Sequence, residues 1–318
     1  MKPIDINTLL STFEMESRGA WAKRIQDAIS PEQQLLDSSL GISITGDRPD
    51  HPAYAKFNHQ WKIGQSFQFN KPVDPNKLNQ EILASLNGGV EHLMISLSDN
   101  LDQETAEVLL DSVIPTYITT TFLLRDSNVS IELPQKWKAD NYEVLNLTTG
   151  THWMTYDANL SVVDNTVAAL SSILQSIDQP TQTYYIYVPI NDNYLSEIAK
   201  LRALHHTFNL INQEYNWQHH LHIVTTYGSD NHKDLDYQKI GNTARATAAI
   251  LGGGHTILPF GLEPNDAEEV RLGINQLHLL HLESYLDKVA DPLAGSHLIE
   301  HCTDTIAKAV WTKLNESQ

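Results

Sequence analysis

Hydrophobic and polar positions in this chain follow a repeating order of short β-type runs and longer helical stripes. The clearest example is YIYVPINDNYLSEIAKLRALHH, residues 185–206. A run of β-formers leads into the polar turn Asn-Asp-Asn. Ile198, Leu201, His205 and Phe208 then recur at spacings of three and four, which indicates one buried helix face. The segment therefore predicts a strand, a tight turn and an amphipathic helix.

The same order recurs along the rest of the chain. We expect strands at 61–69, 91–97, 116–124, 142–148, 183–190, 220–227 and 255–260, and a short eighth strand near Lys288–Asp291. Helices are expected between them and at 297–314. Alternating strands and helices form a parallel sheet, and eight repeats close into a barrel, so the predicted fold class is an α/β TIM (β/α)8 barrel. A doubly wound open sheet is the alternative, but it usually begins with a glycine-rich turn that this sequence lacks.

The first 50 residues do not fit this repeat. Trp21, Ile25 and Ile29 fall on one face of a predicted helix that Pro31 bounds, and GDRPDHP (46–52) is a turn-rich linker. We therefore expect an N-terminal helical arm at 1–50 and a barrel domain at 51–318.

Several predicted strands alternate small polar residues with large apolar ones. Strand positions that face the helices of a barrel must be apolar, so the polar positions are expected to point inward. This favours a wet or ligand-threaded lumen, although Ser and Thr at mere strand ends would give the same pattern. The polar positions are Ser66, Gln68, Ser96, Ser98, Thr119 and Thr121.

Charge and composition narrow the function classes. The 318 residues include 21 Lys and Arg against 39 Asp and Glu, a net charge of −18, which argues against nucleic acid and anionic membranes as partners. Cys302 is the sole cysteine, so the chain has no internal disulfide and suits a reducing compartment. Neither a signal peptide nor an apolar run of membrane-spanning length is evident, and we expect a cytoplasmic protein.

Three short motifs have an ordinary structural explanation. HLIEH (297–301) fits an inverted zinc-protease signature, and HHLH (219–222) with His205–His206 resembles a metal cluster. We expect hydrogen-bonded or partly exposed histidines and no metal site, with a substrate-contacting histidine as the alternative. LGGGH (251–255) lacks the Lys and Ser/Thr of a phosphate loop, so it predicts a helix end and a turn into a strand.

Longer segments carry a family resemblance. IAKLRALHHTFNLI, NTARATAAILGGGHTILPF and LESYLDKVADPLAGSHLIEHCTDTIAKAVW occur in this order. Together they resemble the barrel domain of methylmalonyl-CoA mutases over residues 183–314. Upstream, WKIGQSF and NQEILASLNGGVEHLMISL are similar to the early barrel strands of that family, and FEMESRGAWAKRIQ is similar to the start of its smaller, non-catalytic subunits. The resemblance implies a TIM barrel threaded by the pantetheine of a coenzyme A ester.

The departures from the family pattern concern its chemistry. The family's isomerisation uses adenosylcobalamin on a separate C-terminal domain with a D-x-H-x-x-G ligand motif, and we expect no such domain here. DNHKDL (230–235) has Leu235 in place of the glycine. A family Tyr-His pair corresponds to Thr151 and His152, and a family Gln corresponds to Val224. His222 and Thr225 match the family segment, whereas groups that orient a polar acyl substrate are partly replaced.

These comparisons imply a degenerate methylmalonyl-CoA mutase small-subunit-like protein. It would act as a structural or regulatory partner of a large subunit that carries the cobalamin, or assemble as a homodimer, and would have no catalytic residues of its own. The alternatives are an active acyl-CoA mutase barrel that works with a separately encoded cobalamin-binding chain, and a coenzyme A ester-binding protein. Candidate substrate-binding residues are His152, Tyr156, His222 and Thr225, at the C-terminal ends of the strands.

Overall fold

The computed structural model describes most of the chain from residue 60 onward. The described ranges are 60–137, 142–148, 152–175, 182–228, 235–259, 267–289 and 291–316, with positions 20, 23, 24, 27, 36–37 and 42–43 in the N-terminal part. Strands β1 (Leu36–Asp37) and β2 (Ile42–Ser43) pair with each other in antiparallel fashion. The predicted arm face of Trp21, Ile25 and Ile29 and the linker at 46–52 lie outside the described residues.

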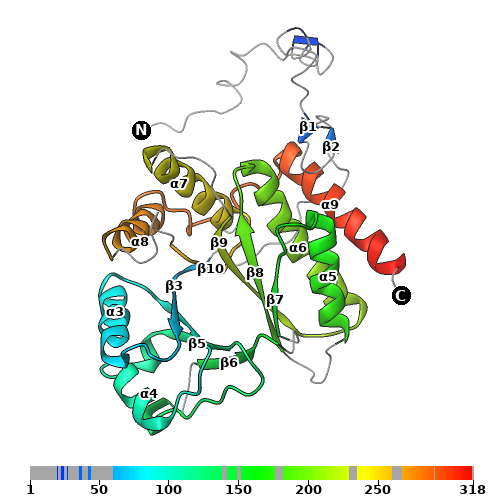
Figure 1. The fold of residues 1–318 in the computed structure, drawn as a ribbon. Coiled ribbons are helices and arrows are strands. Elements are labelled where there is room, and N and C mark those ends of the chain that lie inside the picture. The colour runs from blue at the N-terminus through cyan, green and yellow to red at the C-terminus, as the bar shows by residue number, and fades with distance from the viewer. Residues whose placement is uncertain are drawn as a thin grey trace, which may run out of the picture.

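Eight parallel strands form a nearly closed barrel, which confirms the predicted fold class (Figure 1). Their order in the sheet is β6-β5-β4-β3-β10-β9-β8-β7, so each hydrogen-bonded neighbour is also a neighbour in the chain except where β10 pairs with β3 and closes the circle. The strands are β3 (Lys62–Phe69), β4 (His92–Leu97), β5 (Thr119–Leu124), β6 (Tyr142–Asn146), β7 (Trp153–Thr155), β8 (Thr183–Ile190), β9 (His220–Tyr227) and β10 (Thr256–Ile257).

One strand lies elsewhere than the sequence pattern predicts. The described residues near Lys288 form turns, so the eighth strand expected at Lys288–Asp291 is wrong. The missing strand is β7, which follows β6 after six residues and pairs in parallel with β8 from Trp153↔Tyr185 to Thr155↔Tyr187. Three residues are too few to show an alternation, so no pattern marked this strand.

The helices cover the outside of the barrel (Figure 1). In Figure 1, α5, α6 and α9 lie together along one flank, α7 and α8 cover the opposite flank, and α3 and α4 lie below them. Their bounds are α3 (Pro75–Asn87), α4 (Gln103–Leu109), α5 (Val162–Gln175), α6 (Tyr194–Glu214), α7 (Leu235–Leu251), α8 (Ala267–Leu282) and α9 (His297–Glu316). Two short 3-10 turns, η1 (Pro115–Tyr117) and η2 (Gln135–Trp137), flank β5.

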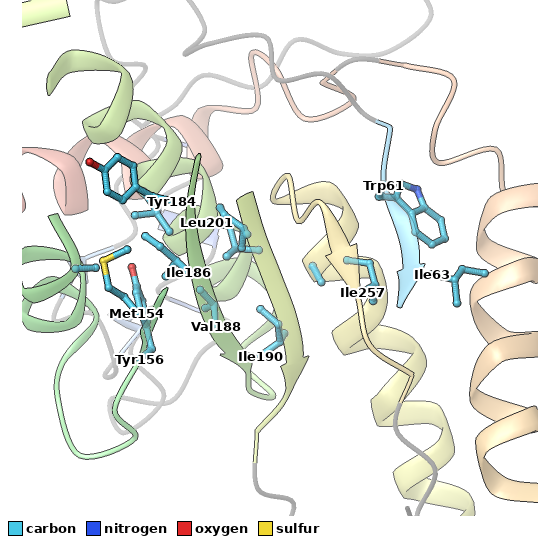
Figure 2. Close-up of a cluster of buried hydrophobic side chains, with 14 of the residues drawn as sticks. Trp61, Ile63, Met154, Tyr156, Tyr184, Ile186, Val188, Ile190, Leu201 and Ile257 are labelled. Carbon is cyan, nitrogen blue, oxygen red and sulfur yellow. The ribbon is translucent and has the colours of Figure 1, made fainter. Parts of the chain in front are cut away.

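The outward face of the sheet carries the main hydrophobic core. Figure 2 shows Ile186, Val188 and Ile190 of β8 on the same side of the strand, facing the helix layer that contributes Leu201 of α6. All four side chains are buried, as are Trp61 and the β3 and β10 isoleucines of the same cluster. Because strand side chains alternate, this arrangement directs the other half of each strand's residues into the lumen.

The glycine-rich turn after α7 has the structure that its sequence predicts. The backbone N–H of Gly254 donates to the carbonyl of Ala249, and Gly253 has φ of +94°, a left-handed conformation that favours glycine. Thr256 then begins β10. LGGGH is therefore a helix end and a turn into the closing strand.

Candidate functional site

Large side chains occupy part of the barrel lumen. A second hydrophobic cluster consists of buried residues that alternate with the outward core residues on their strands: Met94, Leu123, Leu145, Trp153, Tyr185, Val224 and Leu258. Trp153 and Tyr185 have ring centroids 6.2 Å apart with nearly parallel planes. The polar positions point inward, as alternation predicts, and large residues from other strands fill the lumen beside Thr121, whereas Ser66 and Gln68 of β3 stay exposed.

A hydrogen-bonded group of four residues lies beside this cluster. The Oγ1 atom of Thr256 is 2.7 Å from Nδ1 of His92 and 2.8 Å from Nε2 of His222. The Nε2 atom of His92 is 2.9 Å from Oγ1 of Thr121. The two imidazole rings meet edge to face with centroids 5.6 Å apart. These contacts link β4, β5, β9 and β10 across the lumen.

Burial keeps both histidines of this group neutral. Desolvation lowers the pKa of His92 to about 3, with a smaller effect from the positive charge of Lys62. Desolvation also lowers the pKa of His222 to about 3, with smaller effects from His92 and Lys62. Neutral imidazoles can both donate and accept hydrogen bonds, which suits their contacts with threonine hydroxyls.

Glu143 and Tyr185 extend this polar group toward the end of the barrel where the strands begin (the lower mouth). The Tyr185 hydroxyl faces the Glu143 carboxylate and Thr121, and each of these neighbours affects its pKa. Burial raises the pKa of Glu143, and burial together with the Glu143 charge raises the pKa of Tyr185. Thr121 therefore joins this pair to His92.

An open hollow of about 520 Å³ lies at this lower mouth. Lys62, Glu91 and Glu143 supply its charged groups. The Lys62 ammonium donates to Oγ1 of Thr119 at 2.5 Å. The remaining lining residues are Thr116, Tyr117, Ile118, Thr119, Thr120 and Tyr142.

Of the four candidate substrate-binding residues, His222 is the one that faces the lumen. Thr225 lies three residues further along β9, where alternation turns its side chain to the outer face, and its hydroxyl is 3.4 Å from the Thr256 carbonyl. Positions 222 and 225 are an odd number of residues apart, so strand alternation by itself puts their side chains on opposite faces of the sheet. The strand thus does not bring these two side chains together.

The other two candidates face the helix side of the sheet. His152 precedes β7 and stacks on Tyr184, with centroids 5.7 Å apart. Tyr156 is buried in the outer core beside Met154 (Figure 2), and its hydroxyl lies 2.7 Å from Oγ1 of Thr166 on α5. The four residues therefore do not form a single site in this structure. Sequence reasoning missed His92, Glu143 and Tyr185, although His92 shares strand parity with the polar position Ser96.

The three segments that carry the family resemblance contact one another through buried polar groups. Arg202 on α6 donates to both carboxylate oxygens of Asp291 at 2.6 Å and to Glu300 on α9 at 3.0 Å. His205 on α6 contacts the carbonyl of Gly253 at 2.8 Å. These motif residues hold α6, α7 and α9 together, so they identify a scaffold. Glu300 is also the glutamate of HLIEH, where it binds Arg202.

The described part of the chain contains no group of three or more His, Cys, Asp or Glu side chains placed to hold a metal ion. Among its helices, none has both the length and the hydropathy needed to cross a bilayer. The DNHKDL side chains lie outside the described residues.

Comparison with known proteins agrees with the fold. The family model for methylmalonyl-CoA mutase matches residues 149–318, more than half of the chain. A methylmalonyl-CoA mutase small subunit of Porphyromonas gingivalis is 32% identical over 133 residues, which are 38% of this chain and 22% of that protein. A methylmalonyl-CoA mutase of Rhizobium meliloti is 30% identical over 160 residues, which are 47% of this chain and 22% of that protein.

A third relative is the methylmalonyl-CoA mutase small subunit of Streptomyces virginiae, 39% identical over 83 residues, which are 24% of this chain and 14% of that protein. An α/β barrel of eight parallel strands thus carries the family match over its second half. The chain belongs to the methylmalonyl-CoA mutase family. The matched segments cover about a fifth of the length of the first two relatives.

Proposed function

We propose that this chain is a non-catalytic, small-subunit-like barrel that acts as a structural or regulatory partner of a larger, cobalamin-dependent mutase chain. Two of the relatives are named as small subunits, which supports the existence of a partner. The observation that carries the proposal is the cluster of large apolar side chains that occupies part of the lumen. No chemical step is assigned to residues of this chain.

The lumen cluster narrows the path that an acyl-CoA threaded along the barrel axis would take. Met94, Leu123 and Leu258 come from three different strands and meet Tyr185 and Val224 from two others. Every one of these five residues is at least nine-tenths buried. An extended pantetheine would have to displace several close-packed side chains, and close-packed interiors resist such changes.

The replacement of polar residues of the family pattern also supports a non-catalytic role. Val224 stands where the catalytic family segment has a glutamine, and its isopropyl group packs in the lumen cluster, where it can neither donate nor accept a hydrogen bond. Thr151 stands at the family's tyrosine position but lies outside the described residues. We assign adenosylcobalamin to the partner chain, because the family resemblance puts the cobalamin ligand on a domain separate from the barrel.

Assembly is the direct test of this role. A tagged copy of this chain, purified from its native host under gentle conditions, should bring down a larger mutase chain at a fixed stoichiometry, identified by mass spectrometry. The matched control is the same tag on a chain with Arg202→Met, which should lose the α6–α9 scaffold and the partner together. Recovery of this chain alone, at native mass of one copy, would contradict the proposal.

The alternative, an active barrel served by a separate cobalamin chain, has its support in His222 and Thr225, which match the family segment. An activity assay separates the two. The purified chain with adenosylcobalamin and methylmalonyl-CoA should form no succinyl-CoA, and addition of His222→Gln in place of the wild-type chain to a reconstituted complex should leave its rate unchanged. A large loss of rate with His222→Gln, in a complex that still assembles, would establish the active barrel.

A further inference from the structure

The hollow at the lower mouth of the barrel combines features of a binding site. It lies at the N-terminal ends of the strands, opposite the end where barrel enzymes place their catalytic residues. Its volume of about 520 Å³ falls within the range of small-molecule sites. Titratable groups with shifted pKa values lie in and directly behind its wall, and such groups gather at functional sites.

Buried side chains lie behind the wall of the hollow on its lumen side. Glu143 lines the hollow and lies beside Tyr185, which belongs to the lumen cluster. Thr121 and His92 are hydrogen-bonded to each other and fully buried next to them. The lumen side of the hollow is packed at these residues, and the site suits a short molecule.

The charged groups of the wall have both signs. Lys62 offers an ammonium that now donates to Thr119, while Glu91 and Glu143 offer carboxylates. A simple carboxylate would be attracted by one group and repelled by two, and a simple amine would be repelled by Lys62. A molecule with one carboxylate and one ammonium can satisfy both signs, and the net charge of −18 does not repel it.

One residue of the wall has an unpaired hydroxyl that faces away from the lumen. Thr120 is fully buried, and its hydroxyl has no hydrogen-bond partner in the part of the chain that the structure describes. Thr120 shares the strand parity of Phe122, an outer-core residue, so its side chain points to the helix side, and the binding argument rests on the charged groups of the hollow.

We propose that the hollow lined by Lys62, Glu91, Thr120 and Glu143 is a binding site for a small zwitterion that carries a carboxylate and a primary ammonium. Lys62 binds the carboxylate, and Glu91 and Glu143 bind the ammonium. Tyr117 and Tyr142 provide aromatic walls for the carbon chain.

Calorimetric titration with 5-aminopentanoate tests the site. Wild-type protein should show saturable binding, while pentanoate and pentylamine should each bind at least about tenfold more weakly because each leaves one charged group of the wall unmatched. Lys62→Met and Glu143→Gln should each weaken 5-aminopentanoate by about tenfold or more. The matched control is Lys77→Met, an exposed lysine of α3 outside the hollow, which should leave binding unchanged.

A further variant serves as a control within the wall of the hollow. Thr120→Val removes the unpaired hydroxyl on the helix side with little change of shape, so it should keep or raise the thermal midpoint and leave binding unchanged. No saturable binding up to about 10 mM ligand, or equal binding by Lys62→Met, would overturn the proposal. Coenzyme A binding that depends on Lys62 and excludes 5-aminopentanoate would also overturn it, by showing that the hollow takes a nucleotide.

Discussion

Arg202 is the residue on which the family scaffold depends most. Its guanidinium is almost fully buried and faces two buried carboxylates, Asp291 and Glu300. Replacement by methionine fills the volume but leaves both carboxylates without their cation. Arg202→Met should lower the free energy of unfolding by about 3–5 kcal/mol, measured by urea denaturation.

The control for this substitution is Arg271→Met. Arg271 pairs with Glu268 at 3.7 Å on the exposed face of α8. Exposed pairs contribute little, so the loss should stay below about 1 kcal/mol. Equal effects of the two substitutions would show that the buried network does not stabilise the fold.

His92 and His222 make stability depend on pH. The folded-state pKa of each is about 3, below the ordinary value of 6.5, so the unfolded chain binds more protons in between. Stability is therefore complete above pH 6.5 and declines as the pH falls toward 3, by up to about 1.4 kcal/mol per pH unit for each histidine. Denaturation midpoints between pH 7 and pH 4.5 would measure this slope.

The double variant His92→Gln/His222→Gln separates the contribution of the two histidines to the pH dependence of stability from that of the acidic residues, which titrate in the same range. Glutamine retains a donor and an acceptor for Thr121 and Thr256, and the slope of the variant should be shallower than that of the wild type. Imidazole resonances of the wild type offer a second measurement, since both rings should stay neutral at pH 5. Parallel slopes and protonated rings at that pH would contradict the prediction.

At the level of elements, the closure of the barrel depends on a glycine. A Cβ atom at Gly64 of β3 would lie 2.4 Å from Cγ2 of Thr256 and 2.8 Å from Cδ2 of Leu258. Thr256 cannot easily turn away, because its hydroxyl is held by His92 and His222. Gly64→Ala should therefore separate β3 from β10 and cost about 1–3 kcal/mol in thermal or chemical denaturation.

Gly241 of α7 is the matched control, because an added Cβ there meets only Arg245 atoms at 4.0 Å. Gly241→Ala should be neutral or stabilise the protein by up to about 1 kcal/mol through helix propensity. If Gly64→Ala were equally harmless, the close approach of β3 and β10 would not limit packing.

Sequence patterns predicted the longer elements and missed the three-residue strand β7. The strand at 183–190 and the helix that follows it are expected from hydrophobic periodicity, and the structure places both there. β7 has three residues, so its position depends on pairing with β8, which no local pattern encodes. The lumen is similar: Ser96 and Thr121 point inward by alternation, but how Met94 and Tyr185 fill the gap depends on register between strands.

At the scale of the whole molecule, we expect the predicted arm at 1–50 to mediate assembly. Deletion of residues 1–50 should abolish binding to a larger mutase chain, or convert a homodimer to a monomer, while the barrel keeps its thermal midpoint. The apolar set of Phe13, Trp21, Ile25 and Ile29 motivates this prediction. Native mass spectrometry and a thermal melt decide it. A lower midpoint with unchanged assembly would mean that the arm stabilises its own barrel.

The two edge strands of the sheet, β6 and β7, are consecutive in the chain, and the family match begins at residue 149 between them. Two half-barrels therefore share one molecule, and the ladder that joins them is that of β3 and β10, with the pairs Thr256↔Lys62 and Ile257↔Ile63. Mutations in one half have few strand contacts through which to disturb the other. Such a seam allows the halves to diverge at different rates, in line with a family match that begins at residue 149.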